Sequence, residues 1–276
     1  MTSPTSWTSL LRRLLILFTF LSSTHGISGG ELRHVSLASP AMGQETWGFQ
    51  VYLPPSYFAS EDRYPVIYIL HGGGSDEYSM GFVASQFYEP LLPQLPEAIL
   101  VFPNGGRDTF YLDDGVIRRQ RENPDRHLIK ELIPFIDSHF RSIPSREARS
   151  IMGFSMGAYG AYHFGFKYPE LFGAVGALAA GGPYGPQGLI TQYSAAEKPQ
   201  SLAVTQRNQL KDQTTIFIAV GGQDLVDYNN EMAGILRAQG LDFSYQVLPG
   251  AGHDLGALLR SYAQPLFRSL LKQPNF

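Results

Sequence analysis

The sequence predicts an α/β fold with a mostly parallel central sheet flanked by helices. Short apolar, β-rich runs such as Val66–Leu70 and Ile216–Val220 alternate with helical segments along the chain. Strands that alternate with helices are typical of parallel strands joined by right-handed crossovers. The 276 residues, 43% of them hydrophobic and 16% charged, suffice for one large core. We therefore expect a single folded domain over residues 27–276.

The other elements follow from the same patterns. Apolar residues recur at helical spacing from Asp125 to Phe140, and Pro134 should kink that helix rather than end it. The remaining predicted elements are two early antiparallel strands at 31–38 and 46–53, strands at 98–102, 174–178 and 243–248, and helices at 158–166 and 229–239. The long polar segment 181–212, which contains Pro and Gly, lies between strands and is predicted to be a lid or cap.

The most informative motif is Gly153-Phe154-Ser155-Met156-Gly157. An apolar run precedes it and a run of small and aromatic helix formers follows it, which is the order that a nucleophile elbow requires. The serine of such an elbow sits in a tight, strained turn, so its flanking positions are restricted to glycine. Ser155 is therefore the predicted nucleophile. Because the chain holds 29 glycines, the motif alone can arise by chance and needs a base and an acid beside it.

The acid and the base are predicted further along the chain. Asp224 follows the strand at 216–220, and His253 lies in the loop after the strand at 243–248. An imidazole can take the proton of the serine hydroxyl as that hydroxyl attacks a carbonyl carbon, and a carboxylate can hold the imidazole in the required tautomer. Asp227 is an alternative acid; Asp113 and Asp114 are weaker rivals because they precede the serine. An ordinary turn serine, a capping aspartate and a surface histidine are the non-catalytic alternatives.

A further motif, His71-Gly72-Gly73-Gly74, follows the strand at 66–70. Backbone N–H groups can stabilise the negative charge of a tetrahedral intermediate only where no side chain intrudes. We expect the Met156 N–H and an N–H from Gly72 or Gly73 to form this oxyanion site. A flexible loop is the alternative for the glycine run, and His71 is interpreted as a structural hydrogen-bonding residue.

Several motifs recur in the order of one known family. They are Leu53-Pro54-Pro55-Ser56-Tyr57, Tyr64-Pro65-Val66-Ile67-Tyr68-Ile69-Leu70-His71-Gly72, Glu131-Leu132-Ile133-Pro134, Gly153-Phe154-Ser155-Met156-Gly157 and Gly250-Ala251-Gly252-His253-Asp254. On these residues the chain resembles the esterase D-like "putative esterase" family of α/β-hydrolases, from about Leu32 to the C-terminus. The chain order Ser, Asp, His is that of α/β-hydrolases. The resemblance implies an α/β-hydrolase catalytic domain.

The resemblance also narrows the activity. The family includes feruloyl esterases, acetylxylan esterases, S-formylglutathione hydrolases and mycolyltransferases. The formylglutathione branch fits less well, because the resemblance leads us to expect a cysteine after the first His-Gly and this chain has no cysteine. The secreted polysaccharide-esterase branch fits better. Two tyrosines are candidate substrate-binding residues: Tyr111 in the acyl pocket and Tyr184, with Tyr193 beside it in the chain segment 181–212. Alternatively, these tyrosines only cover the edge of the core.

Composition limits the partners. A formal net charge of −3 gives no basic patch for a phosphate backbone, so nucleic acid is not an expected partner. The absence of cysteine excludes disulfides and thiolate metal sites. No metal-ligand spacing occurs in the sequence, and no cofactor is expected. The number of subunits is left open.

The N-terminus is typical of a secretory signal peptide over residues 1–26. Arg12 and Arg13 precede the apolar run at 14–21, and small polar residues follow it. The apolar run is short for a membrane span, and Ser23 or Gly26 offers a cleavage point. A retained anchor is the alternative. We therefore expect a secreted or periplasmic protein without stable membrane insertion after cleavage.

These features together predict a secreted serine carboxylic-ester hydrolase that works through an acyl-enzyme on an acylated carbohydrate or on small acyl or feruloyl esters. An acyltransferase with the same Ser-His-Asp set would pass the acyl group to an alcohol instead of water. A non-catalytic esterase-shaped binding module and a serine peptidase are further alternatives.

Overall fold

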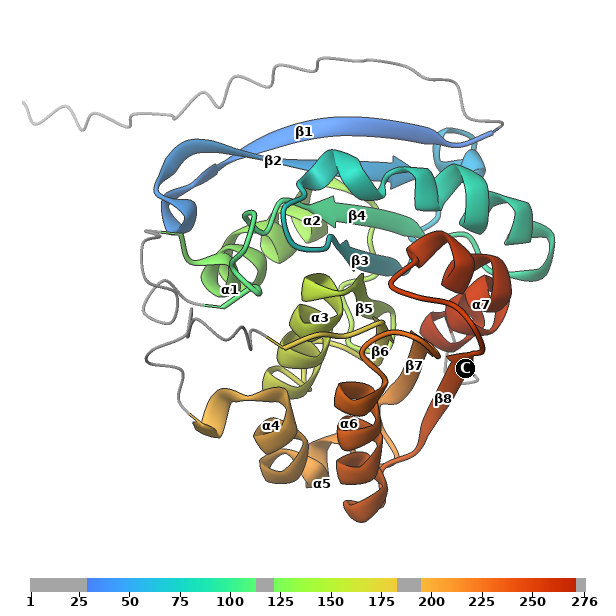
Figure 1. Cartoon of the computed structure of the whole chain (residues 1–276). Helices are drawn as coiled ribbons and strands as arrows, with labels where there is room; N and C mark the ends of the chain where they lie inside the picture. The colour runs from blue at the N-terminus through green and yellow to red at the C-terminus, as the bar shows by residue number, and fades with distance from the viewer. Residues whose placement is uncertain (1–28, 113–121, 183–194, 272–276) are drawn as a thin grey trace, which may run out of the picture.

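One eight-stranded sheet runs through the computed structural model, which describes residues 29–112, 122–182 and 195–271. The strand order is β1-β2-β4-β3-β5-β6-β7-β8 (Figure 1). The strands are β1 (Glu31–Ser39), β2 (Gln44–Leu53), β3 (Val66–Leu70), β4 (Ile99–Pro103), β5 (Arg149–Phe154), β6 (Ala174–Leu178), β7 (Thr215–Gly221) and β8 (Phe243–Leu248). β1 and β2 are antiparallel, whereas all pairs from β4 to β8 are parallel. The predicted mostly parallel sheet is confirmed, and the predicted leader 1–26 lies outside the described residues.

The helices cover both faces of the sheet (Figure 1). The α-helices are α1 (Pro124–Arg126), α2 (Ile133–His139), α3 (Met156–Lys167), α4 (Pro199–Thr205), α5 (Arg207–Leu210), α6 (Val226–Ala238) and α7 (Leu255–Leu270). Short 3-10 or π turns are η1 (Pro40–Met42), η2 (Pro55–Phe58), η3 (Glu77–Met80), η4 (Ala84–Tyr88), η5 (Glu89–Gln94), η6 (His127–Leu132) and η7 (Ala195–Glu197). No helix within the described ranges is both long enough and apolar enough to cross a membrane.

Two apolar layers explain the continuous apolar strands. One core contains residues of α3, α4 and α6 and of one sheet face, and the other contains residues of η4 and α7 against the opposite face. Every residue of β3, β4 and β6 is buried, as is expected for strands covered on both sides. β1 lies at the edge and alternates instead from Val35 onward, with Val35, Leu37 and Ser39 buried. Packing on both faces therefore holds the carboxyl ends of the central strands in fixed positions.

The segment 125–140 differs in detail from the single kinked helix that the periodicity predicts. The chain forms α1, a π-helical turn η6 and then α2. Pro134 lies in the first turn of α2, where a missing backbone N–H is tolerated. The proline therefore coincides with a change of hydrogen-bonding pattern.

The predicted lid segment 181–212 is partly helical. Its second half forms α4 and α5, and α4 contacts α3 and α6. Leu202 and Ala203 of α4 are buried in the core. This half therefore belongs to the helical layer, because its apolar residues close the core beside α3. Residues 183–194 lie outside the described chain.

A buried carboxylate fixes α1 to α3. Asp125 accepts hydrogen bonds from His163 Nε2 at 2.9 Å, Lys167 Nζ at 2.8 Å and the Tyr168 hydroxyl at 2.6 Å. Burial alone would raise the pKa of Asp125, but these donors outweigh it and lower the pKa to about 2. These bonds hold helix α3, which follows the candidate nucleophile, near its C-terminal end.

Candidate active site

Ser155 lies in a strained turn between β5 and α3. Its backbone has φ 57° and ψ −117°, a conformation that non-glycine residues seldom adopt. A Cβ on Gly153 would collide with the carbonyl oxygen of Gly157, and a Cβ on Gly157 would collide with that of Leu70. The two glycines are thus required because helix α3 starts directly against β5 and β3. This packing leaves Ser155 half-buried at the carboxyl edge of the sheet.

The candidate acid and base come together from two neighbouring strands. Asp224 follows β7 and His253 follows β8, and His253 Nδ1 lies 2.9 and 3.0 Å from the two carboxylate oxygens of Asp224. Side-chain exposure is 6% for Asp224 and 40% for His253, so the acid is shielded while the imidazole faces solvent. The Gln223 N–H donates to the Ala251 carbonyl at 2.9 Å, which ties the two loops together.

The imidazole of His253 lies beside the elbow. Its ring centroid is 4.6 Å from that of Phe154, the residue before Ser155. Within the described chain, the Ser155 hydroxyl has no hydrogen bond to this imidazole, and such bonds often tighten only when substrate binds. Asp227 is exposed in the first turn of α6, and among described hydrogen bonds the partner of His253 is Asp224. The geometry therefore gathers Ser155, His253 and Asp224 at one edge.

His71 holds the glycine loop in place. Its Nε2 accepts a hydrogen bond from the Gly105 N–H at 3.0 Å, so the proton is on Nδ1, which donates to the Gly72 carbonyl at 2.8 Å. Burial lowers the pKa of His71, which keeps the ring neutral for this double role. The expected structural role of His71 agrees with these bonds.

Two more hydrogen bonds connect the glycine loop to the loop after β4. The Gly74 N–H donates to the Arg107 carbonyl at 2.6 Å, and Asn104 Nδ2 donates to Glu77 Oε2 at 2.7 Å. Sequence reasoning missed this clasp between residues 71–77 and 104–108. The Asn-Gly-Gly sequence after a predicted strand was the available signal, but it does not identify the partner loop.

Gly72 lies next to the Ser155 side chain, and Gly73 lies next to Met156. A Cβ built on Gly72 would lie 3.6 Å from the Cβ of Ser155, and one built on Gly73 would lie 4.0 Å from the Cβ of Met156. Met156 begins α3, where the first amides have no partner within the helix. Backbone donors from two loops therefore lie next to the candidate nucleophile.

Of the predicted substrate-binding tyrosines, the structure describes Tyr111. Tyr111 is 1% exposed, and its hydroxyl donates to the His71 carbonyl at 3.4 Å, so it supports the glycine loop from below. Tyr184 and Tyr193 lie outside the described residues, as do the rival acids Asp113 and Asp114.

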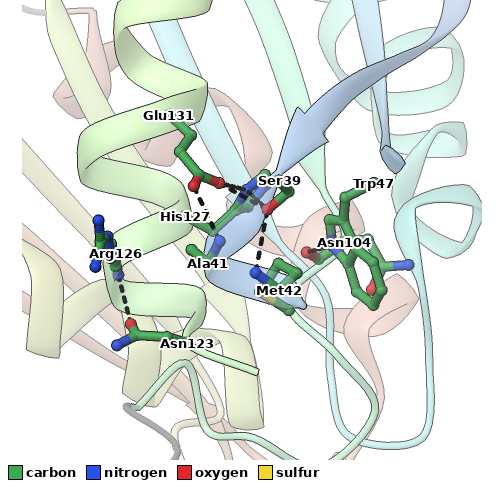
Figure 2. A network of polar contacts seen from close by, with 9 residues as sticks. All are labelled: Ser39, Ala41, Met42, Trp47, Asn104, Asn123, Arg126, His127 and Glu131. Atoms are coloured by element: carbon green, nitrogen blue, oxygen red, sulfur yellow. Dashed lines mark hydrogen bonds and ion pairs between the residues drawn. The ribbon is translucent and has the colours of Figure 1, made fainter. Parts of the chain in front are cut away.

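A second Ser-His-carboxylate cluster lies where the end of β1 meets η6 (Figure 2). Ser39 Oγ donates to Glu131 Oε2 at 2.6 Å, and His127 Nδ1 lies 2.9 Å from Ser39 Oγ and 3.0 Å from Glu131 Oε2. Ser39 is fully buried, and His127 Nε2 is buried with no hydrogen-bond partner in the part of the chain that the structure describes. Burial alone would raise the pKa of Glu131, but hydrogen bonds from His127, Ser39 and the Ala41 amide hold it below its ordinary value.

No group of three or more His, Cys, Asp or Glu side chains within the described ranges could hold a metal ion. A groove of about 680 Å³ is lined by residues such as Thr215, Ile216 and Phe243. These residues begin β7 and β8, so the groove lies at the sheet edge opposite to Ser155. It is separate from the candidate site.

The fold is that of an α/β-hydrolase, with Ser155, Asp224 and His253 at the carboxyl edge of its sheet. The family model described as "Putative esterase" matches residues 39–249, and the chain belongs to that family. The predicted family resemblance is confirmed.

Named relatives agree with this family membership. An esterase of Mycobacterium tuberculosis is 33% identical over 123 residues, which is 44% of this chain and 26% of the relative. An endo-1,4-beta-xylanase/feruloyl esterase of Xylanibacter ruminicola is 26% identical over 260 residues, or 90% of this chain and 33% of the relative. The chain thus spans a third or less of these relatives. A solved ferulic acid esterase superposes with a TM-score of 0.75 at 24% identity, covering 87% of this chain and 97% of that one.

Proposed function

We propose that the protein is a serine carboxylic-ester hydrolase with Ser155 as nucleophile, His253 as general base and acid, and Asp224 as the carboxylate that orients the imidazole. The observation that carries this proposal is the Asp224–His253 pair, which stands beside the strained Ser155 turn. The family membership supports the same activity.

The proposed reaction begins when His253 takes the hydroxyl proton of Ser155, whose oxygen attacks the ester carbonyl carbon. The imidazolium, stabilised by Asp224, then gives that proton to the departing alcohol, which leaves an acyl group on Ser155. Water then attacks the acyl carbon while the same imidazole takes its proton. The imidazolium returns that proton to the Ser155 oxygen as the acyl–oxygen bond breaks and the carboxylic acid leaves.

The Met156 and Gly73 amides are the proposed oxyanion donors. Because a trans peptide directs C=O and the next N–H in opposite directions, the bond from His71 to the Gly72 carbonyl turns the Gly73 N–H away from the His71 ring. Gly73 also neighbours Met156, the other proposed donor. A first-turn helix amide and this loop amide would then converge on the developing charge.

A fluorophosphonate probe with peptide mass spectrometry tests the nucleophile. We expect one phosphonylated peptide, carrying the adduct on Ser155, and loss of labelling in Ser155→Ala. Ser39, which is buried, serves as the internal comparison. An adduct on another serine, or labelling that persists in Ser155→Ala, would contradict the assignment.

The proposed substrates are acylated carbohydrates or small acyl and feruloyl esters. Relatives named feruloyl esterase and acetyl esterase support this range. A panel of nitrophenyl esters of increasing chain length, with methyl ferulate and acetylated xylan, would rank the acyl groups. Product analysis with an added alcohol would show acyl transfer if transfer products exceeded the free acid.

Export is also proposed, from the Arg12-Arg13 pair and the apolar run at 14–21. Expression of the full chain followed by N-terminal sequencing of the product outside the cell should find a new terminus near Gly26. Retention of the whole chain in the membrane fraction would favour an uncleaved anchor instead.

A further inference from the structure

Gly73, which carries one of the proposed oxyanion donors, lies beside the loop that carries Arg107 and Asp108. A Cβ built on Gly73 would lie 3.4 Å from Asp108 Oδ1, 3.9 Å from the Arg107 carbonyl oxygen and 4.0 Å from the Cβ of Met156. Both polar atoms within this range are acceptors, and the third neighbour is apolar. A hydroxyl group of a substrate placed beside Gly73 would therefore find acceptors for its hydrogen.

The Asp108 carboxylate is free to accept that donor. Asp108 is exposed, and the described residues give its side chain neither an ion pair nor a hydrogen bond. Its neighbour Arg107 is also exposed and, within the described chain, forms no ion pair with it. A carboxylate accepts strong hydrogen bonds from hydroxyl groups and repels another carboxylate.

The position of Asp108 is fixed by the loop clasp. The Gly74 N–H holds the Arg107 carbonyl, and His71 holds the Gly105 amide, so the backbone on the N-terminal side of Asp108 is tied to the glycine loop. These bonds fix the position of the backbone that carries the carboxylate, which limits where the carboxylate can reach. Gly73 and Asp108 both face solvent, which suits the hydroxylated alcohol part of an ester more than its acyl chain.

We propose that Asp108 is a specificity-determining residue that accepts a hydrogen bond from a hydroxyl of the substrate's alcohol part and disfavours esters whose alcohol carries a carboxylate. This inference rests on the proposed esterase function and narrows its substrates to neutral polyhydroxyl esters.

Three butyrate esters with one acyl group test the proposal: propyl butyrate, glycerol monobutyrate and 3-(butyryloxy)propanoate. All three give the same butyryl-enzyme, so differences in kcat/KM report recognition of the alcohol. Asp108→Ala should lower kcat/KM for the glycerol ester relative to the propyl ester by about tenfold. Asp108→Asn should keep part of that preference, because its carbonyl still accepts.

The anionic ester separates charge from hydrogen bonding. Asp108→Asn should raise kcat/KM for the propanoate ester relative to the propyl ester by about fivefold at low salt, and about 1 M salt should remove most of this gain. Asp62→Asn is the matched control, because Asp62 is exposed just before Tyr64 and β3, at the opposite sheet edge, and its loss should change neither ratio.

The outcomes are distinguishable from failure of the esterase function itself. Ratios that stay within about twofold of wild type in both Asp108 variants would overturn the role of Asp108 while Ser155-dependent butyrate release continued. Butyrate release that is absent in the wild type, or unaffected by Ser155→Ala, would instead overturn the proposed function.

Discussion

Two clusters of serine, histidine and carboxylate occupy the same molecule and differ in how the imidazole is used. At the carboxyl edge of the sheet, His253 Nδ1 is held by Asp224 while the ring remains 40% exposed beside the elbow. At the end of β1, His127 Nδ1 faces both Ser39 and Glu131 (Figure 2), and its Nε2 is buried with no hydrogen-bond partner among the described residues. In the proposed relay the two imidazole nitrogens have two separate partners. At His253 one nitrogen is hydrogen-bonded to Asp224 and the exposed ring leaves room for Ser155, whereas at His127 both Ser39 and Glu131 meet the same nitrogen.

The backbone separates the two clusters as clearly as the side chains do. Ser155 stands in a positive-φ turn at the start of α3, whereas Ser39 ends an edge strand and caps η1 by accepting the Met42 N–H at 3.3 Å. The Ser39 hydroxyl is thereby committed to structure. The comparison teaches that residue types alone do not define a catalytic set. Solvent access to the side chains and the partner of each imidazole nitrogen also have to fit.

The largest expected effect is on turnover after loss of Ser155. Ser155→Ala should reduce kcat/KM for a nitrophenyl ester by about 10⁴-fold or more, because the nucleophile is absent. The melting temperature should stay equal or rise slightly, because the substitution by alanine removes no buried contact. Comparable turnover in wild type and variant would contradict the catalytic role proposed for the Ser155 cluster and leave it no different in function from the Ser39 cluster.

The orienting acid should come next. Asp224→Asn should lower kcat by about 10³- to 10⁴-fold, because an amide favours the wrong imidazole tautomer. Asp227→Asn is the matched control, since Asp227 is exposed on the next helix and should change kcat less than about threefold. The reverse ranking would assign the acid role to Asp227.

The buried cluster should affect stability instead of turnover. Ser39→Ala should lower the free energy of unfolding by about 2 kcal/mol, because it removes a hydrogen bond to a carboxylate and the cap of η1. Chemical denaturation measures this loss, with kcat/KM on a nitrophenyl ester as the companion readout. A fall in kcat/KM beyond about threefold in the folded variant would link Ser39 to the reaction.

The smallest effect is the pH dependence of stability from Glu131. Its pKa is lowered in the folded state, so its contribution is complete above the unfolded value of about 4.3 and is lost as pH falls through the folded value. The melting-temperature gap between wild type and Glu131→Gln should therefore narrow from pH 7 toward acid. The titration of Asp125 affects both proteins equally and cancels in the difference. A melting-temperature gap that stays constant with pH would therefore contradict the contribution of Glu131 to stability.

The sequence by itself determined the framework of the site. Continuous apolar runs identified the central strands, because strands covered on both faces cannot alternate. The Gly-x-Ser-x-Gly spacing identified the elbow, because only glycine tolerates the contacts at 153 and 157. The strand-end positions of Asp224 and His253 also followed from local patterns, since parallel strands end at one edge.

Only the tertiary structure decided how distant segments complete the site. The clasp between residues 71–77 and 104–108, the position of Asp108 beside Gly73 and the burial of Tyr111 depend on which loops meet at the sheet edge. The same is true of the buried cluster, in which His127 and Glu131 lie 88 and 92 residues after Ser39 in the chain. Local sequence fixes periodicity and turn chemistry, but hydrogen-bond partners and solvent access are set by packing between elements, which no local pattern encodes.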